Sequence, residues 1–276
     1  MLPDPAGPAP SGGDENGEEP LGDAESPGHV EDGVTAEDGV TAEDADETPE
    51  FADLALPTLA ALREALEWAF QGEEVNAGYL DHCAEHALLV QEANRRMNLT
   101  KIVEPREIAA KHYLDCWRAA RYLPLMGRSL LDFGSGAGYP GVPIALAEPN
   151  ARVVVLDSTK KKAEFMAESI AKMKLPNVRA VGERVEDHLV KNHYDIVIVR
   201  AVSSVRENVR SLRKVRHSLR DLVMMKGPSW SREVRAGERE AERLGFKLDT
   251  VWEYKLPGEM GDRAVLVYRA PGGQGR

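Results

Sequence analysis

The sequence predicts an α/β fold in which a helical extension precedes a mostly parallel sheet of seven strands. Three observations support this prediction. Apolar residues recur at helical spacing up to about residue 122. Short apolar runs then alternate with helical stretches from about residue 129 onward. A glycine-rich turn follows the first of these runs, and strand–helix alternation of this kind is typical of a parallel sheet.

The N-terminal helices are indicated by apolar residues three and four positions apart. One series is Leu59, Leu62, Leu66 and Phe70, and a second is Leu80, Cys83, Ala87 and Val90. Glu104-Pro105 predicts the start of another helix, because proline suits a first helical turn. We expect this helical extension to occupy residues 53–125.

The α/β domain is expected at residues 126–270, followed by a flexible C-terminus at 271–276. Its strands are predicted at 129–133, 151–156, 177–181, 195–199, 222–225, 247–254 and 264–268, with helices at 160–173, 205–219 and 231–244. The run at 195–199 is the clearest strand, because a strand covered on both faces is continuously apolar. No helix separates the last two strands, which predicts an antiparallel pair.

Charge is distributed unevenly along the chain. Residues 1–50 contain 16 acidic and no basic residues, whereas the remainder contains 35 basic and 30 acidic residues. The net charge of −11 therefore conceals a basic body. We expect residues 1–52 to be disordered, because they carry too little apolar surface to offset the entropy of ordering. This acidic tail is interpreted either as a solvated segment or as a competitor of nucleic acid for the basic body.

The sequence also bears on the compartment. We expect no signal peptide, because a basic start followed by an apolar stretch is missing. No run approaches the 18 apolar residues of a membrane span. Cys83 and Cys116 lack the spacing of metal ligands and are expected to be reduced thiols. The prediction is a cytoplasmic protein without a bound metal or membrane contact.

The glycine-rich turn at 132–141 is the strongest local signal. Its glycines permit a tight turn and the close approach of a ligand, and ligands of open α/β sheets bind at the carboxyl ends of strands. A nucleoside triphosphate is disfavoured, because the Gly-Lys-Ser/Thr ending is missing. Gly136, Gly138 and Gly141 fit the dinucleotide pattern, but that pattern starts three residues after the strand. The carboxylate of Asp132 beside the turn instead favours a cationic cofactor, S-adenosylmethionine. A turn without a ligand is the remaining alternative.

Further candidate residues stand at the ends of the next strands. Asp157 is placed to accept hydrogen bonds from ribose hydroxyls, or alternatively to cap the following helix. The acidic stretch 182–187 can receive the adenine amino group, present its backbone to adenine, or be a solvated turn. Arg200 directly follows an apolar strand at the carboxyl edge of the sheet, where a charge is rarely buried without a partner. We favour a functional role for it over a structural ion pair.

Several motifs occur in a fixed order between about residues 80 and 269. They are Asn98-Leu99-Thr100, Lys111-His112-Tyr113-Leu114-Asp115, the turn from Asp132 to Gly141, Leu156-Asp157-Ser158 with Lys161-Lys162, Arg200-Ala201, Met225-Lys226-Gly227, Pro257-Gly258 and Asp262-Arg263. With this order the chain resembles the bacterial 16S ribosomal RNA guanine-N7 methyltransferases. Val199 departs from the pattern, since that family usually has serine there.

The resemblance implies the class I S-adenosylmethionine-dependent methyltransferase fold, which is Rossmann-like, with an antiparallel C-terminal strand. It implies methylation of N7 of a guanine in 16S ribosomal RNA, with that RNA or the small ribosomal subunit as partner. Cofactor contacts are implied at Gly134, Tyr139, Val185, Glu186 and Arg200, and the turn and strand end add Gly136, Gly138 and Asp157. The alternatives are a methyltransferase of the same fold for another RNA, a protein or a small molecule, and an inactive homologue that binds RNA or cofactor.

Guanine N7 has an in-plane lone pair and no proton, so methyl transfer to it needs no general base. Catalysis is then expected to come from positioning. We expect Arg200 and Lys226 to act as the catalytic residues, by shaping the site and holding a guanine oxygen or a nearby phosphate. His112 either packs between helices or touches the target base.

A basic helix is expected at 205–219. Arg206, Arg210, Arg213 and Lys214 have spacings of three and four and would share one face of it. Such a face either contacts RNA phosphates, which gives affinity without sequence readout, or is merely solvated.

Overall fold

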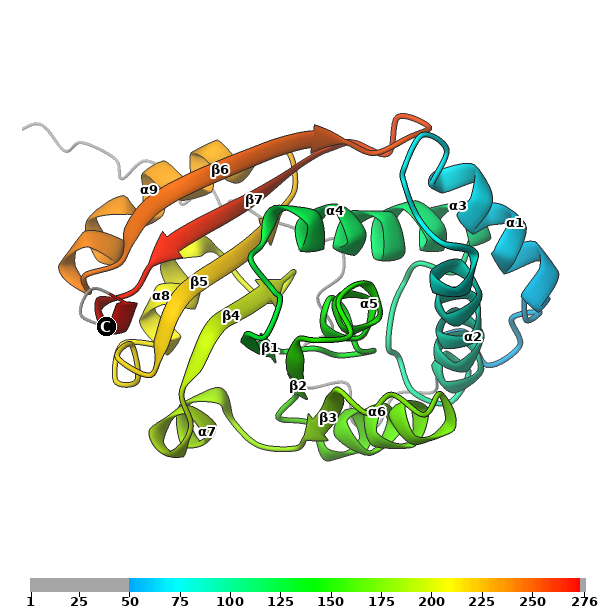
Figure 1. The fold of residues 1–276 in the computed structure, drawn as a ribbon, viewed down its shortest axis with the longest axis horizontal. Helices are drawn as coiled ribbons and strands as arrows, with labels where there is room; N and C mark the ends of the chain where they lie inside the picture. The colour runs from blue at the N-terminus through cyan, green and yellow to red at the C-terminus, as the bar shows by residue number, and fades with distance from the viewer. Residues whose placement is uncertain (1–49, 274–276) are drawn as a thin grey trace, which may run out of the picture. The chain divides into compact units, whose positions relative to one another are not determined.

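The computed structural model describes residues 50–273. Nearly all of the predicted disordered tail, and residues 274–276, lie outside the described residues. Within residues 50–273, strands form one seven-stranded sheet in the order β3-β2-β1-β4-β5-β7-β6 (Figure 1). The strands are β1 Ser129–Phe133, β2 Arg152–Leu156, β3 Val178–Val181, β4 Tyr194–Arg200, β5 Leu219–Lys226, β6 Lys247–Lys255 and β7 Asp262–Arg269. In this part of the chain β7 alone runs in the direction opposite to the other strands, which confirms the predicted sheet and its antiparallel C-terminal pair.

The strand order reverses between β1 and β4. From β1 the chain proceeds outward to β2 and β3, and then returns to the other side of β1 to form β4 and β5. In an open α/β sheet the connections after these strands diverge at such a point and leave a crevice at the carboxyl ends. The glycine-rich turn after β1 and Arg200 at the end of β4 therefore flank the same crevice.

Helices cover both faces of the sheet. Alternate strand residues point to opposite faces, so Leu130 and Ile196 join one buried cluster whereas Leu131 and Val197 join another. The first face carries α5 (Gly141–Ala147) and α6 (Lys160–Lys172). The second face carries α7 (Val185–Lys191), α8 (Val205–Ser211) and α9 (Trp230–Arg243).

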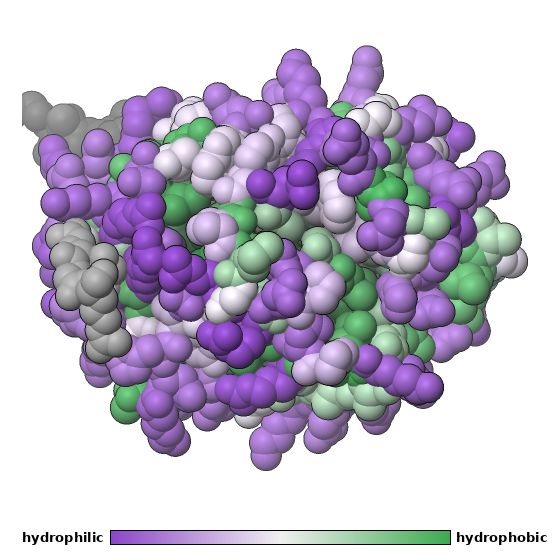
Figure 2. Space-filling view, in the orientation of Figure 1, coloured by the Kyte–Doolittle hydropathy of each residue, from purple (hydrophilic) through white to green (hydrophobic). Residues whose placement is uncertain are grey.

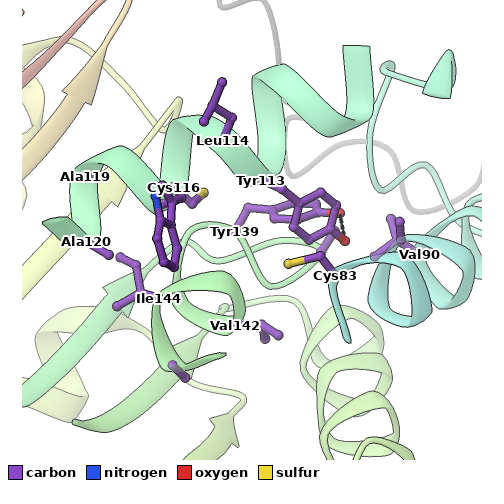
Figure 3. Packing of buried hydrophobic residues seen from close by; sticks show 14 of the residues in the cluster. Cys83, Val90, Tyr113, Leu114, Cys116, Ala119, Ala120, Tyr139, Val142 and Ile144 are labelled. Atoms are coloured by element: carbon purple, nitrogen blue, oxygen red, sulfur yellow. Dashed lines mark hydrogen bonds between the residues drawn. The ribbon is translucent and has the colours of Figure 1, made fainter. Parts of the chain in front are cut away.

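The N-terminal helices pack on the first face of the sheet. They are α1 (Leu59–Ala69), α2 (Ala77–Asn94), and a continuous stretch made of α3 (Pro105–Glu107), the π-helical segment η2 (Ile108–Leu114) and α4 (Asp115–Tyr122). The Glu104 side chain accepts a hydrogen bond from the Glu107 backbone, which confirms the predicted helix start. Helix α4 packs on α5, and Cys116 and Ala120 of α4 share one hydrophobic cluster with Ile144 of α5 (Figure 3).

The predicted basic helix at 205–219 is wrong in its length. Helix α8 ends at Ser211, residues 212–218 form turns, and Leu219 already pairs with Tyr194 at the start of β4. The apolar spacing continues past the helix because Leu212 and Val215 are also buried. Pairing of β5 along the full length of β4 overrides that local pattern. Arg213 and Lys214 are exposed in the turns and do not share a helical face with Arg206.

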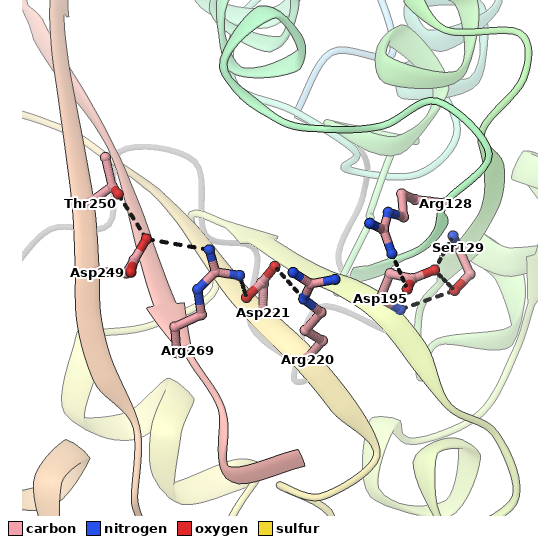
Figure 4. A network of polar contacts seen from close by, with 8 residues as sticks. All are labelled: Arg128, Ser129, Asp195, Arg220, Asp221, Asp249, Thr250 and Arg269. Carbon is pink, nitrogen blue, oxygen red and sulfur yellow. Dashed lines mark hydrogen bonds and ion pairs between the residues drawn. The ribbon is translucent and has the colours of Figure 1, made fainter. Parts of the chain in front are cut away.

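Polar networks tie the strands together at the edge opposite the crevice (Figure 4). Asp195 at the start of β4 accepts hydrogen bonds from the backbone and the hydroxyl of Ser129, each at 2.9 Å, and from Arg128 at 3.1 Å. Asp221 of β5 accepts a hydrogen bond from Arg269 of β7 at 2.6 Å. These contacts fix strand register at the amino ends of β4 and β5 and leave the carboxyl edge open for ligands.

The face seen in Figure 2 carries mostly hydrophilic side chains, with smaller hydrophobic patches between them. Within residues 50–273 no helix is long and apolar enough to cross a bilayer. Cys83 and Cys116 are both buried and not joined in a disulfide.

Candidate active site

A pocket of about 520 Å³ lies at the carboxyl edge of the sheet. This volume falls within the usual range of small-molecule sites. Side chains and backbone from the ends of β1, β2 and β4, the start of α7, and the N-terminal helices line it. The residues that line it include Leu99, Thr100, His112, Gly134, Gly136, Tyr139, Asp157, Lys162, Val185, Glu186, Arg200 and Val202.

The glycine-rich turn forms one wall of the pocket. The backbone N–H groups of Gly134 and Ser135 donate to the Leu156 carbonyl at 2.9 and 3.0 Å, which ties the turn to the end of β2. Gly134 has φ +72°, and a Cβ atom at this position would lie 2.7 Å from Val202 Cγ2. Gly136 has φ +56°, with nothing within 4 Å of such an atom. Gly134 is therefore required by both conformation and space, whereas Gly136 is required by conformation alone.

Gly138 lies behind the turn and does not line the pocket. It has φ +99°, and a Cβ atom there would lie 2.9 Å from Val142 and 3.2 Å from His86 Nε2. The structure thus brings Gly134 and Gly136, but not Gly138, to the position where we expected a cofactor. Close packing of the turn against α2 and α5 explains the glycine at 138.

Asp132 lies beneath the turn and not at its mouth. Its side chain is fully buried, and Oδ2 accepts hydrogen bonds from the Ser135 hydroxyl and from the Gly141 backbone, the latter at 2.8 Å. Oδ1 has no hydrogen-bond partner among residues 50–273. Burial raises the pKa of this carboxyl to about 7, against hydrogen bonds from Ser135 and Gly141 that lower it. The expectation that Asp132 faces the ligand is wrong, because its carboxyl group is buried beneath the turn, where Oδ2 holds the turn together.

Asp157, at the end of β2, faces the pocket. Its Oδ2 accepts from the Gly136 backbone at 3.0 Å, and its Oδ1 accepts from the Thr159 backbone at 2.9 Å. A carboxylate offers about four acceptor positions, so two remain for a ligand. Asp157 therefore orders the start of α6 and keeps acceptor positions at the pocket, so both interpretations of the sequence are compatible with its place.

Val185 and Glu186 begin α7 on the far side of the turn. Val185 is buried in the second cluster, Glu186 lies in the first helical turn, and both line the pocket. Glu183, just before them, hydrogen-bonds Nδ1 of the buried His188. His188 thus anchors the acidic stretch through Glu183, and the stretch places Val185 and Glu186 at the pocket.

Arg200 is held by groups of the N-terminal helices. Its Nη1 donates to the Lys111 carbonyl at 2.8 Å, and its Nη2 donates to His112 Nδ1 at 2.9 Å. The Asp115 carboxylate lies 3.8 Å away, and the guanidinium carbon lies 5.3 Å from the centre of the Tyr139 ring. Arg200 therefore has a buried ion partner and also lines the pocket, so the two interpretations of this residue are compatible.

Tyr139 and His112 form an aromatic wall. Their rings stack with centroids 4.2 Å apart and an interplanar angle of 13°. The Tyr139 hydroxyl lies 2.9 Å from the Tyr113 hydroxyl (Figure 3). The Tyr113 hydroxyl in turn lies 2.9 Å from His86 Nδ1. Burial lowers the pKa of His86 to about 4, so this histidine is neutral at pH 7. A buried chain of polar groups thus holds the tyrosine ring in place.

Lys226 does not line the pocket. Its ammonium lies 2.8 Å from Glu233 and donates to the Ser203 carbonyl, and its side chain is only 8% exposed. The expected direct contact with a base or phosphate is therefore not what this structure shows. Lys226 instead holds the segment 201–204, whose Val202 packs over Gly134.

Some pocket residues were not singled out as site residues from the sequence. Leu99 and Thr100 line the pocket because Asn94, at the end of α2, accepts hydrogen bonds from both of their backbone N–H groups. The Asn98-Leu99-Thr100 motif pointed to the turn after α2, although the sequence did not assign it a role. Lys162 lines the pocket from the first turn of α6.

The arrangement fits S-adenosylmethionine. Asp157 has acceptor capacity left for a ribose diol, and the backbone at Gly136 borders open space. The carboxylates of Asp157 and Glu186 border the pocket. These acidic groups suit an ammonium and a sulfonium better than they suit a pyrophosphate.

Comparison with known proteins identifies the family. The family model described as rRNA small subunit methyltransferase G (GidB) matches residues 80–259. A Ribosomal RNA small subunit methyltransferase G of Solibacter usitatus is 37% identical over 192 residues, 67% of this chain and 88% of that protein. The protein of the same name from Carboxydothermus hydrogenoformans is 31% identical over 188 residues, 67% of this chain and 80% of that protein.

Among solved structures, a SAM-dependent methyltransferase from Aquifex aeolicus is similar with a TM-score of 0.42 and 16% identity, over 57% of this chain and 90% of that one. The family match covers the glycine-rich turn, the ends of β2 and β4, and the segment that holds Arg200. The chain therefore belongs to the rRNA small subunit methyltransferase G family, which confirms the predicted methyltransferase and its S-adenosylmethionine cofactor.

Proposed function

We propose that this protein transfers a methyl group from S-adenosylmethionine to N7 of a guanine in 16S ribosomal RNA, in the cytoplasm, with the RNA or the small ribosomal subunit as partner. One observation carries the proposal. A single pocket joins the Gly134 turn and Asp157, from β1 and β2, to Arg200 and His112 on the β4 side. Such a pocket has one half for a nucleoside cofactor and another half for a base.

The cofactor half consists of the turn and the ends of β2 and β3. Gly134 and Gly136 let the cofactor approach the backbone, and Asp157 accepts hydrogen bonds from its ribose hydroxyls. Val185 and Glu186 border the adenine, and Tyr139 closes the side toward α2. When bound, S-adenosylmethionine supplies a methyl group made electrophilic by the positive sulfur.

The base half consists of His112, Arg200 and the turn after α2. Guanine N7 attacks with its own lone pair, so the residues here need only hold the base in line with the methyl group. Arg200 fixes the His112 ring and places its charge over Tyr139. Lys226 acts on the reaction as a positioning residue, by holding the segment 201–204 against the glycine turn.

Exposed cations surround the parts of the chain that form the pocket. Lys101 follows Thr100, and Lys160 and Lys161 precede Lys162 in α6. A second basic group runs through α8, the turns after it and the start of β5. Its members Arg206, Arg210, Arg213, Lys214 and Arg220 are all exposed. Phosphate contacts from such residues supply affinity and orientation, while the pocket selects the base.

The test is methyl transfer from a radiolabelled donor to purified small subunits, free 16S RNA and protein fractions. We expect label in 16S RNA, as 7-methylguanosine at one position. Cells that lack the gene should lose that modification and regain it with the intact gene. Label in protein or in small molecules, with unmodified RNA, would refute the proposal and favour another methyltransferase of the same fold.

A further inference from the structure

The hydroxyl of Thr100 stands at the end of a hydrogen-bond chain that starts at Arg200. Arg200 Nη2 lies 2.9 Å from His112 Nδ1, and His112 Nε2 lies 3.1 Å from Thr100 Oγ1. The backbone N–H of Ile102 donates to the same oxygen at 3.0 Å. Thr100, His112 and Arg200 all line the pocket, so this chain reaches the ligand space.

The direction of each hydrogen bond follows from the chemistry of arginine. A guanidinium has only donors, so His112 Nδ1 must accept from it. A neutral imidazole carries one N–H, which then resides on Nε2 and is donated to Thr100. Burial, with Arg200 and other nearby groups, holds the pKa of His112 well below its usual value, so the ring is neutral.

These directions leave the Thr100 hydroxyl with one further hydrogen bond to make, as a donor. Its oxygen has two acceptor positions, and the N–H groups of His112 and Ile102 occupy both. The hydroxyl proton is then available only for donation. No acceptor for it occurs among the hydrogen bonds of residues 50–273, and Thr100 borders the pocket. Thr100 is therefore a directed donor toward whatever occupies this side of the pocket.

This side of the pocket is where the proposed function places the base. The sheet order puts β4 on one side of β1, and β2 and β3 on the other. Asp157 at the end of β2 belongs to the cofactor half, whereas Thr100 is linked through His112 to Arg200 at the end of β4. The directed donor thus belongs to the base half.

We infer that Thr100 determines base specificity by donating its hydroxyl proton to O6 of the target guanine, an assignment that rests on the proposed function. Guanine presents two acceptors, N7 and O6, on one edge. Adenine presents its N6 amino group, a donor, in place of O6. A hydroxyl that can only donate stabilises guanine with N7 at the methyl group and leaves adenine facing a second donor.

The test is a double-mutant cycle between the protein and its substrate. Small subunits are assembled with 16S RNA that carries either guanine or 2-aminopurine, which is guanine without O6, at the methylated position. Single-turnover methylation of both is measured for the wild-type protein and for Thr100→Val. The ratio of the methylation rate on guanine to that on 2-aminopurine should be roughly fivefold to tenfold larger for the wild-type protein than for Thr100→Val. A factor of this size is the usual net effect of one hydrogen bond. Thr100→Ser retains the hydroxyl and should retain that preference.

This comparison of base preferences depends neither on the folded fraction of each protein nor on the intrinsic reactivity of each base. The two bases are compared within each protein, so a smaller folded fraction of Thr100→Val cancels. The intrinsic reactivity of N7 in each base cancels between the proteins. Binding of S-adenosylhomocysteine, measured by calorimetry, should be equal for wild type and variant within about twofold.

Two outcomes would overturn the assignment. Equal base preferences in wild type and Thr100→Val would show that Thr100 does not contact O6. An equal loss on both bases, together with weaker S-adenosylhomocysteine binding, would place Thr100 against the cofactor. If the wild-type protein leaves guanine in the small subunit unmethylated, the proposed function fails, and the assignment fails with it.

Discussion

The guanidinium of Arg200 donates a hydrogen bond from Nη2 to Nδ1 of His112, 88 residues earlier in the chain, across 2.9 Å. The neighbouring Lys111 carbonyl accepts from Nη1 of the same guanidinium at 2.8 Å. Both acceptors lie in the π-helical segment η2, a type of helix that is rare and frequent at functional sites. This relationship joins the N-terminal helices to the end of β4, on the side of the pocket where we propose that the base binds.

Replacing Arg200 should impair catalysis more than cofactor binding. Arg200→Ala removes the group that holds His112 and leaves the Asp115 carboxylate buried without this partner. We expect the methylation rate to fall by about a hundredfold or more, because misplaced reacting groups have effects of that size. The dissociation constant of S-adenosylhomocysteine should change only a few fold. Arg128→Ala, which breaks an ion pair at the opposite edge of the sheet, is the matched control. A fully active Arg200→Ala protein would contradict the role of this residue.

Replacing Asp157 should impair cofactor binding more than catalysis. Asp157→Ala removes the acceptors for a ribose diol, and each hydrogen bond to a charged acceptor contributes about 1.5–3 kcal/mol. Calorimetry should show S-adenosylmethionine affinity reduced at least about tenfold. Asp195→Ala provides the control, because Asp195 also accepts two hydrogen bonds from Ser129 but lies at the amino end of β4. Similar losses of affinity in both variants would argue against a ribose contact at Asp157.

A comparison of Gly134→Ala with Gly127→Ala separates the effect of backbone strain from the effect of a steric clash. Both glycines have positive φ, +72° and +70°, so alanine strains both. A methyl group at 134 also meets Val202 at 2.7 Å, whereas nothing lies within 4 Å at 127. Both variants should lose about 1 kcal/mol of unfolding free energy or more. Only Gly134→Ala should lose cofactor affinity, measured by calorimetry on folded protein. Unchanged affinity in Gly134→Ala would remove the turn from the cofactor half.

Asp132→Asn should change how stability depends on pH. Burial raises the pKa of Asp132 to about 7, well above the usual range of a carboxyl group, so the folded protein favours the protonated carboxyl. Its contribution to stability is complete below about pH 4 and is lost as the pH rises through about 7. The asparagine variant keeps an acceptor for Gly141 and has no such charge.

Urea unfolding at several pH values tests this expectation. The stability of the wild type relative to Asp132→Asn should decrease between pH 4 and 7, by up to about 1.4 kcal/mol per pH unit for one proton. Parallel pH profiles of the two proteins would show that Asp132 is ionised normally in the fold.

The lysines beside the pocket should contribute to RNA affinity in a salt-dependent way. Lys160→Gln and Lys161→Gln remove exposed charges at the start of α6, next to Lys162 in the pocket. Each should weaken binding of 16S RNA and reduce the slope of log affinity against log salt by about 1. Arg235→Gln and Arg239→Gln, on exposed positions of α9, are controls with the same charge change. Equal effects at both places would indicate general charge attraction without a defined RNA surface.

The sequence by itself determined the architecture and one half of the pocket. Strand positions such as 196–199 were predictable because a strand buried on both faces is continuously apolar, whatever surrounds it. The glycine turn and Asp157 were predictable because cofactor contacts in such folds occur at consecutive strand ends, which are local in sequence.

Only the tertiary structure decided the rest. The direction of Asp132 depends on hydrogen bonds to Ser135 and Gly141 in the folded turn, and the length of α8 depends on pairing between β5 and β4. The base half joins Thr100, His112 and Arg200, which are far apart in the chain and meet only when the N-terminal helices pack on the sheet. Periodicity reports which face of an element is buried, but the partner of a polar group is fixed by packing over long sequence distances.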